Sequence, residues 1–168
     1  MLPLFECEDI VDIPKEMLWE EIKQIDRLGR YFPFIKATYE LDDVFAKWIL
    51  KSPLLPESET KHFIAHISVD YPHNLICWQA KGLDLELLGE IHLKENGSSD
   101  HSKIKAILQL RIKDSSKVLP NQLMLTKLKF DLNNFIQRLI ANVRRTEEIP
   151  EVIIPIEQQS IMQYTTQR

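Results

Sequence analysis

The sequence predicts an α+β protein in which an antiparallel β-sheet packs against one long helix near the C-terminus. Six strand-like runs lie at close spacing between residues 34 and 114, and short turn segments join them in pairs. A helical pattern without Gly or Pro fills residues 122–147. Helical and strand patterns are segregated along the chain rather than alternating, which is typical of α+β proteins.

The first part of the chain is expected to supply one strand and two helices. Residues 4–13 read as a strand that Pro14 ends. Residues 14–25 repeat apolar side chains at helical spacing, with an acid in the first turn. A short second helix is expected in residues 26–31, before Pro33.

Six strands are expected to follow as three hairpins. The strand-like runs are residues 34–41, 44–51, 59–70, 74–81, 83–95 and 102–114. The turns around 42–43, 71–73 and 96–97 carry Asp, Pro and Asn-Gly, which favour tight reversals of the chain. Strands joined by such short turns run antiparallel.

The run at residues 83–95 predicts a two-faced strand. Its sequence, LDLELLGEIHLKE, alternates apolar and polar residues, and only Leu88 is out of phase. One face of such a strand covers apolar groups while the other meets water. We therefore expect Asp84, Glu86 and Glu90 to face solvent. The space under the apolar face is either solid core or a hollow that holds a ligand.

The segment 122–147 predicts one amphipathic helix. Apolar residues, including Leu128, Leu132 and Phe135, recur at spacings of three or four and form a single stripe. We expect this stripe to pack against the sheet. Residues 1–148 are therefore expected to form one domain, followed by a tail at 149–168.

Composition limits the classes of function. The 168 residues are 44% hydrophobic and 27% charged, which is ordinary for a soluble domain. The net charge of −4 gives no general attraction to nucleic acid, so we expect no DNA partner. The sequence has no run of about 18 apolar residues, no basic signal-peptide region and no CxxC pair. We expect a cytoplasmic protein that is not an integral membrane protein.

Motifs for catalysis or metal binding are weak. His62 and His66 have HxxxH spacing, but on a strand their side chains lie roughly 13 Å apart, too far to share one ion. Glu86 and Glu90 are separated in the same way, and Cys7 lies among acids expected to raise its pKa. The sequence contains no GxSxG, Walker or GxGxxG pattern. We therefore expect no metal, no cofactor and no catalytic residue, which favours a binding protein over an enzyme.

Three segments together resemble one known superfamily. Residues 12–36, DIPKEMLWEEIKQIDRLGRYFPFIK, combine a strand end, a Trp-bearing helix and an aromatic-Pro step. Residues 62–82 contain a Pro turn and Trp78, and residues 87–93 form a Gly-bearing strand. In order and spacing these segments resemble the START-like (SRPBCC) superfamily, of the polyketide cyclase/dehydrase or coenzyme Q-binding-protein type, over about residues 4–148.

The resemblance implies a helix-grip fold: a curved antiparallel sheet of six or seven strands around a long C-terminal helix, with a cavity between them. It also implies that a lipid, an isoprenoid or quinone, or a polyketide-like compound binds in that cavity. Because the apolar wall lacks an inward acid–base pair, we expect a non-enzymatic carrier or accessory protein. Two alternatives stay open, a polyketide cyclase/dehydrase-type enzyme and a module that interacts with a protein or the ribosome. The support for such a module is a basic face at Lys103, Lys105, Arg111 and Lys113, which a solvated strand face explains better.

The expected cavity wall is apolar on both sides. Strand alternation and helical spacing select the facing residues: Phe63, Ala65, Ile67, Leu85, Leu87, Gly89, Ile91, Ala106, Leu108, Leu110, Leu128, Leu132, Phe135 and Leu139. Small residues such as Gly89 are expected to permit curvature and leave room for a ligand. Glu8, Asp9, Arg30 and Tyr39 are candidates for polar groups in the wall.

Overall fold

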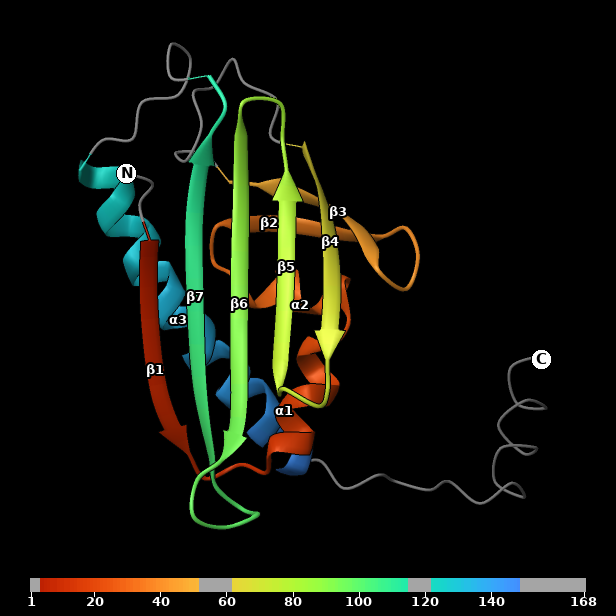
Figure 1. Cartoon of the computed structure of the whole chain (residues 1–168), viewed down its shortest axis with the longest axis vertical. Helices are drawn as coiled ribbons and strands as arrows, with labels where there is room; N and C mark the ends of the chain where they lie inside the picture. Colours follow the sequence, from red (N-terminus) through yellow and green to blue (C-terminus); the bar gives the residue numbers. More distant parts are fainter. Residues whose placement is uncertain (1–3, 52–61, 115–121, 149–168) are drawn as a thin grey trace, which may run out of the picture.

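The computed structural model describes residues 4–51, 62–114 and 122–148 (Figure 1). The predicted tail at 149–168 lies outside the described residues. The strands are β1 (Leu4–Val11), β2 (Ile35–Glu40), β3 (Phe45–Leu50), β4 (His62–Asp70), β5 (Leu75–Lys81), β6 (Leu85–Glu95) and β7 (Ser102–Ile112). The helices are α1 (Lys15–Ile22), α2 (Ile25–Tyr31) and α3 (Gln122–Glu148).

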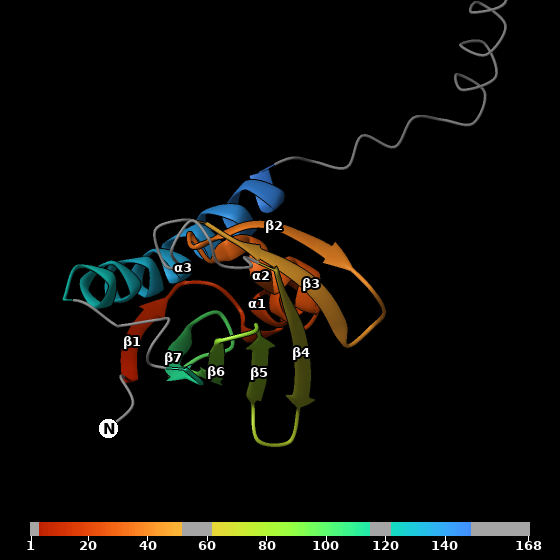
Figure 2. The same ribbon diagram turned by 90° about the horizontal axis from the view of Figure 1, so that it is seen from above.

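The strands form one antiparallel sheet in the order β1-β7-β6-β5-β4-β3-β2. The three predicted hairpins are present. β1 forms one edge of the sheet and pairs with the last strand, β7. Viewed from above, the sheet curves so that β2 and β3 turn over the helices (Figure 2). The sheet and the long helix together confirm the predicted helix-grip architecture.

The segment predicted as one helix is continuous and packs against the sheet. α3 contacts β1, β7, α1 and α2, while α2 covers β2, β3 and β4. The buried stripe of α3 includes Leu128, Leu132, Phe135, Leu139 and Val143. Among the described residues, no helix combines the length and the apolar character needed to span a membrane.

Aromatic rings fill the middle of the space between the sheet and α3. Phe32, which follows α2, stacks on Phe135 of α3 with ring centroids 4.4 Å apart. Its ring is also 5.0 Å from that of Trp78 on β5 and 6.1 Å from that of Trp48 on β3. Phe32 therefore connects the sheet wall of the core to its helix wall.

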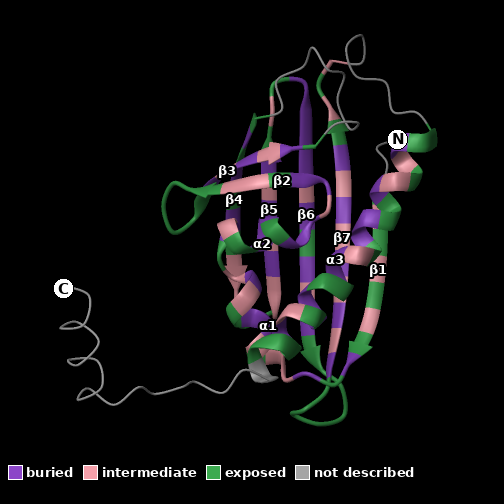
Figure 3. Ribbon diagram, turned by 180° about the vertical axis from the view of Figure 1, so that it is seen from behind, coloured by how far each residue is buried: buried purple, intermediate pink, exposed green. Residues whose placement is uncertain are grey.

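One expectation about the run at residues 83–95 is wrong. Asp84 and Glu86 were expected to face solvent, but both are buried, whereas Glu90 is exposed as predicted. Glu86 accepts hydrogen bonds from Gln79 of β5 and from Arg111 of β7, the latter at 3.0 Å. Alternation selects the face of a strand, but long side chains on neighbouring strands decide whether that face is covered. Figure 3 shows how burial alternates along the strands.

Candidate functional site

The predicted wall residues lie together inside the fold. All fourteen are buried, and those of the sheet face the stripe of α3 as strand alternation predicts. Apart from Gly89, which is buried as well, none has more than 3% of its surface exposed. A hollow wide enough for water would leave its walls accessible, so side chains occupy the space between these residues in this structure. Ligand binding by this set stays a prediction, and it requires the wall to open.

Gly89 makes room for a side chain of the protein itself. Gly89 on β6 is the register partner of Trp78 on β5. A Cβ atom at Gly89 would lie well under 3.0 Å from three atoms of the Trp78 indole. The indole is further enclosed by the rings of Phe32 and Trp48, at 5.0 and 5.2 Å. The small residue that sequence analysis assigned to ligand space therefore accommodates a neighbouring tryptophan.

The indole nitrogen of Trp78 is a polar group that sequence analysis missed. Its Nε1 is buried and has no hydrogen-bond partner among the described residues. The indole of Trp48, by contrast, donates to the carbonyl oxygen of Ile25 at 3.3 Å. A buried donor left unpaired costs about 1–3 kcal/mol. The sequence carries no signal for this, because pairing depends on which carbonyl groups the fold places nearby.

The four polar residues considered for the wall do not reach the interior. Glu8 and Arg30 are exposed and form ion pairs at the surface. Asp9 accepts a hydrogen bond from Gln137 of α3 at an exposed edge. Tyr39 is 54% exposed. The interior therefore receives no acid or base from these positions.

The Cys7 thiol is held in its protonated form. Burial raises its pKa to about 11, with a smaller contribution from the negative charge of Asp9. The Sγ atom donates to the carbonyl oxygen of Leu132 at 3.4 Å. Sequence analysis attributed the raised pKa to neighbouring acids, whereas loss of hydration is the larger cause. A protonated thiol is a poor nucleophile.

The two histidines of β4 lie on the outer face of the sheet. His62 and His66 are exposed, opposite the buried Phe63, Ala65 and Ile67, as strand alternation predicts. Within the described ranges, no group of three His, Cys, Asp or Glu residues could hold a metal ion.

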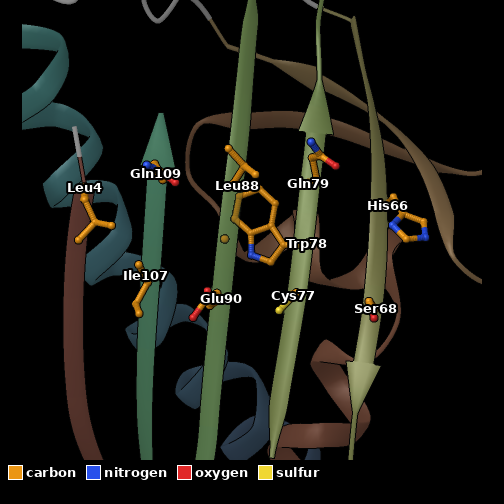
Figure 4. A pocket seen from close by; sticks show the side chains of 11 residues that line it. Leu4, His66, Ser68, Cys77, Trp78, Gln79, Leu88, Glu90, Ile107 and Gln109 are labelled. Atoms are coloured by element: carbon orange, nitrogen blue, oxygen red, sulfur yellow. The ribbon is translucent and has the colours of Figure 1, made fainter. Parts of the chain in front are cut away.

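A shallow pocket of about 340 Å³ lies on the outer face of the sheet (Figure 4). Side chains from β1, β4, β5, β6 and β7 line it. Leu4, Leu88 and Ile107 supply apolar surface, and Leu88 is the residue that breaks the polar row of β6. Figure 4 also shows the indole of Trp78 extending from β5 across to β6. The pocket lies on the opposite side of the sheet from α3.

Comparisons with known proteins identify the fold. No family model and no curated protein sequence matches the chain. The Zhui aromatase/cyclase from a Streptomyces species matches with a TM-score of 0.68 at 11% identity, covering 86% of this chain and 95% of that chain. A START superfamily protein from Mycobacterium smegmatis matches with a TM-score of 0.66 at 11% identity, covering 85% and 98%. These likenesses confirm the START-like fold that the sequence predicts.

Proposed function

We propose that the chain binds an apolar small molecule carrying a hydrogen-bond acceptor, between the sheet and α3, as a non-enzymatic carrier or accessory protein. The observation that carries this proposal is the unpaired Nε1–H of Trp78 in an apolar interior. A ligand carbonyl oxygen would accept a hydrogen bond from it. Quinones, polyketide-like compounds and fatty acyl compounds combine such an oxygen with a large apolar surface. The fold likeness to an aromatase/cyclase and a START superfamily protein supports this ligand class.

Phe32 is the side chain that must move for the ligand to bind. Its ring lies between Trp78 of the sheet and Phe135 of α3, so displacing it separates the two walls. Burial of the ligand gains roughly 25 cal/mol per Å² of apolar area. For a chain of about 10–15 carbons this gain offsets the costs of ordering the ligand and parting the rings, and micromolar affinity is expected.

Carriage is favoured over catalysis by the placement of the buried acids. Glu86 lies on the outer face of the sheet with Arg111, and Asp131 of α3 is paired with Lys127 at 3.2 Å. No two of the acids or bases described above converge in the apolar interior, whereas acid–base catalysis needs positioned titratable groups.

The basic strand face lends little support to a protein- or ribosome-binding role. Lys103 and Lys105 of β7 pair with acids of β1 at 2.9 and 3.4 Å. Arg111 pairs with Glu86 of β6. Neighbouring strands thus neutralise most of this face.

The test compares two ligands on two proteins by isothermal titration calorimetry. A short-chain quinone and a hydrocarbon of matched size are titrated into the wild type and into Trp78→Phe, which keeps an aromatic ring but removes the N–H. The quinone is expected to lose about two- to tenfold in affinity for Trp78→Phe, the range of one hydrogen bond. The hydrocarbon should lose less, because it reports only the change in ring size.

Ala106→Trp provides a second arm, since its ring would occupy the space that a ligand takes. Because side chains fill this interior in the ligand-free chain, Ala106→Trp is expected to block binding and to lower the free energy of unfolding by about 1–3 kcal/mol. Absence of quinone and hydrocarbon binding to the wild type, or unchanged binding to a folded Ala106→Trp, would sink the carrier proposal. Native mass spectrometry of protein purified from its own host would then identify whether any small molecule travels with it.

A further inference from the structure

Away from the apolar interior, a cleft of about 540 Å³ lies between α2 and the C-terminal half of α3. Both helices face the viewer in Figure 3. Four arginines line this cleft: Arg27 and Arg30 from α2, and Arg138 and Arg145 from α3. Among the residues that the structure describes, Glu21 is the one carboxylate in its lining. In a chain with a net charge of −4, this is a local concentration of positive charge.

Helical spacing explains why the arginines converge. Arg138 and Arg145 are seven positions apart on α3, with Asn142 between them, so the three side chains share one helical face. Arg27 and Arg30 are three positions apart on α2 and share a face in the same way. The two helices present these faces to the same cleft.

Most of the guanidinium groups have no counterion among the residues that the structure describes. Arg30 pairs with Asp26 at 3.4 Å. Arg27, Arg138 and Arg145 form no ion pair or hydrogen bond with any residue that the structure describes. Each retains its set of N–H donors, and their mutual repulsion would be relieved by a bound anion.

Three lining residues of the cleft are joined by hydrogen bonds. The hydroxyl of Tyr31 donates to Glu21 at 2.7 Å and accepts from the side-chain amide of Asn142 at 2.8 Å, linking all three helices. Burial is the main cause that raises the pKa of Tyr31 well above its ordinary value, and the hydrogen bond to Glu21 adds to it. The phenol therefore stays neutral. The Glu21 carboxylate is thus bound to the Tyr31 hydroxyl, and it forms no ion pair with the arginines of the cleft among the described residues.

We propose that this cleft is a binding site for a phosphate-bearing group. A phosphate carries close to two negative charges and three acceptor oxygens, and the planar guanidinium fork matches its geometry. Three unpaired arginines suit a multiply charged anion better than a single carboxylate. A volume of about 540 Å³ accommodates a diphosphate or a phosphorylated small molecule. This site is separate from the apolar interior and does not rest on the carrier proposal.

Inorganic pyrophosphate is the probe for a soluble ligand. The full chain is titrated at low salt by calorimetry and by NMR, with the side-chain amide of Asn142 as a local reporter. Arg138→Gln and Arg145→Gln are each expected to weaken binding about tenfold or more, as loss of a charge-assisted hydrogen bond does. Arg144→Gln is the matched control, because Arg144 is exposed on the same helix but pairs with Asp12 outside the cleft. It should bind within about twofold of the wild type, since it loses only remote charge.

Vesicles distinguish a lipid headgroup from a soluble phosphate. Binding to phosphatidic acid vesicles, whose headgroup is a phosphate monoester, but not to pyrophosphate or phosphatidylcholine vesicles, assigns the phosphate to a lipid. Binding to pyrophosphate assigns it to a soluble ligand. Absence of both, or an equal loss of affinity in Arg144→Gln and Arg138→Gln, overturns the proposal, since the latter result indicates diffuse surface charge. A shift of the Asn142 amide in the wild type gives a readout that does not depend on the variants.

Discussion

Replacing Gly89 with alanine is expected to destabilise the fold strongly, because the new methyl group would meet the indole of Trp78. The added carbon would lie well under 3.0 Å from three indole atoms, whereas carbon atoms in contact prefer about 3.5–4.0 Å. The indole has little freedom to retreat, since Phe32 and Trp48 flank it at 5.0 and 5.2 Å between ring centroids. We expect a loss of about 3 kcal/mol in the free energy of unfolding, the upper part of the range for overpacked cores.

Urea denaturation of four proteins measures this effect: the wild type, Gly89→Ala, Trp78→Leu and the double variant. Trp78→Leu removes the colliding ring, so alanine at position 89 should cost less than about 1 kcal/mol in that background. Gly97→Ala serves as a control for the glycine change alone. Gly97 has φ +80° and open space around it, so its substitution costs backbone strain of about 1–2 kcal/mol in both backgrounds.

A loss below about 1 kcal/mol for Gly89→Ala, or the same loss with and without Trp78, would refute this reasoning. A loss below about 1 kcal/mol would mean that the space over Gly89 is open, as sequence analysis first suggested for this glycine. An equal loss in both backgrounds would mean that the cost does not arise from the indole.

Three further predictions follow from single side chains. Phe32→Ala should lower the free energy of unfolding by about 3–5 kcal/mol, because it empties a buried site. If the carrier proposal holds, the variant should also bind an apolar probe more tightly, because no ring then has to move. Folding raises the pKa of the Cys7 thiol from 9.0 to about 11. The stability that this thiol contributes below about pH 9 should therefore be lost as the pH rises through 11. In a pH series of denaturation curves, Cys7→Ala should lack this loss. Ser102→Ala removes a buried hydrogen bond of 2.5 Å to the carbonyl oxygen of Ile13. In urea denaturation it should lower the free energy of unfolding by about 1–3 kcal/mol. The control Ser68→Ala, at an exposed position, should lower it by less than about 0.5 kcal/mol.

Periodicity predicted much of this fold because it records which face of each strand or helix is apolar. The alternation of β6 and the three-four spacing of α3 are dictated by burial, so their bounds and inward faces could be read from the sequence. The fourteen residues that these patterns select for the wall are all buried, while their role in ligand binding stays a prediction. They do not report how the space between the walls is filled.

The features that sequence analysis missed depend on side chains from distant segments. The space beside Gly89 is occupied by the Trp78 indole of the neighbouring strand. Glu86 is covered by Arg111 from β7. The arginine cleft joins α2 to α3, which are separated in sequence by most of the sheet. The seven-residue spacing of Arg138 and Arg145 was a visible signal, but their partner helix was not.

The pairing of β1 with β7 sets the order in which the chain can fold during synthesis. Ser102 lies 89 positions after Ile13, the residue whose carbonyl oxygen it binds. At about 5–20 residues per second, translation leaves β1 without its partner for on the order of 5–20 s. The hairpins between β2 and β6 can form in that interval, while the first strand waits as an unpaired edge. β1 is therefore accessible to chaperones and proteases before α3 has been synthesised. Addition of β1 to the edge of the sheet is a late step of folding during synthesis.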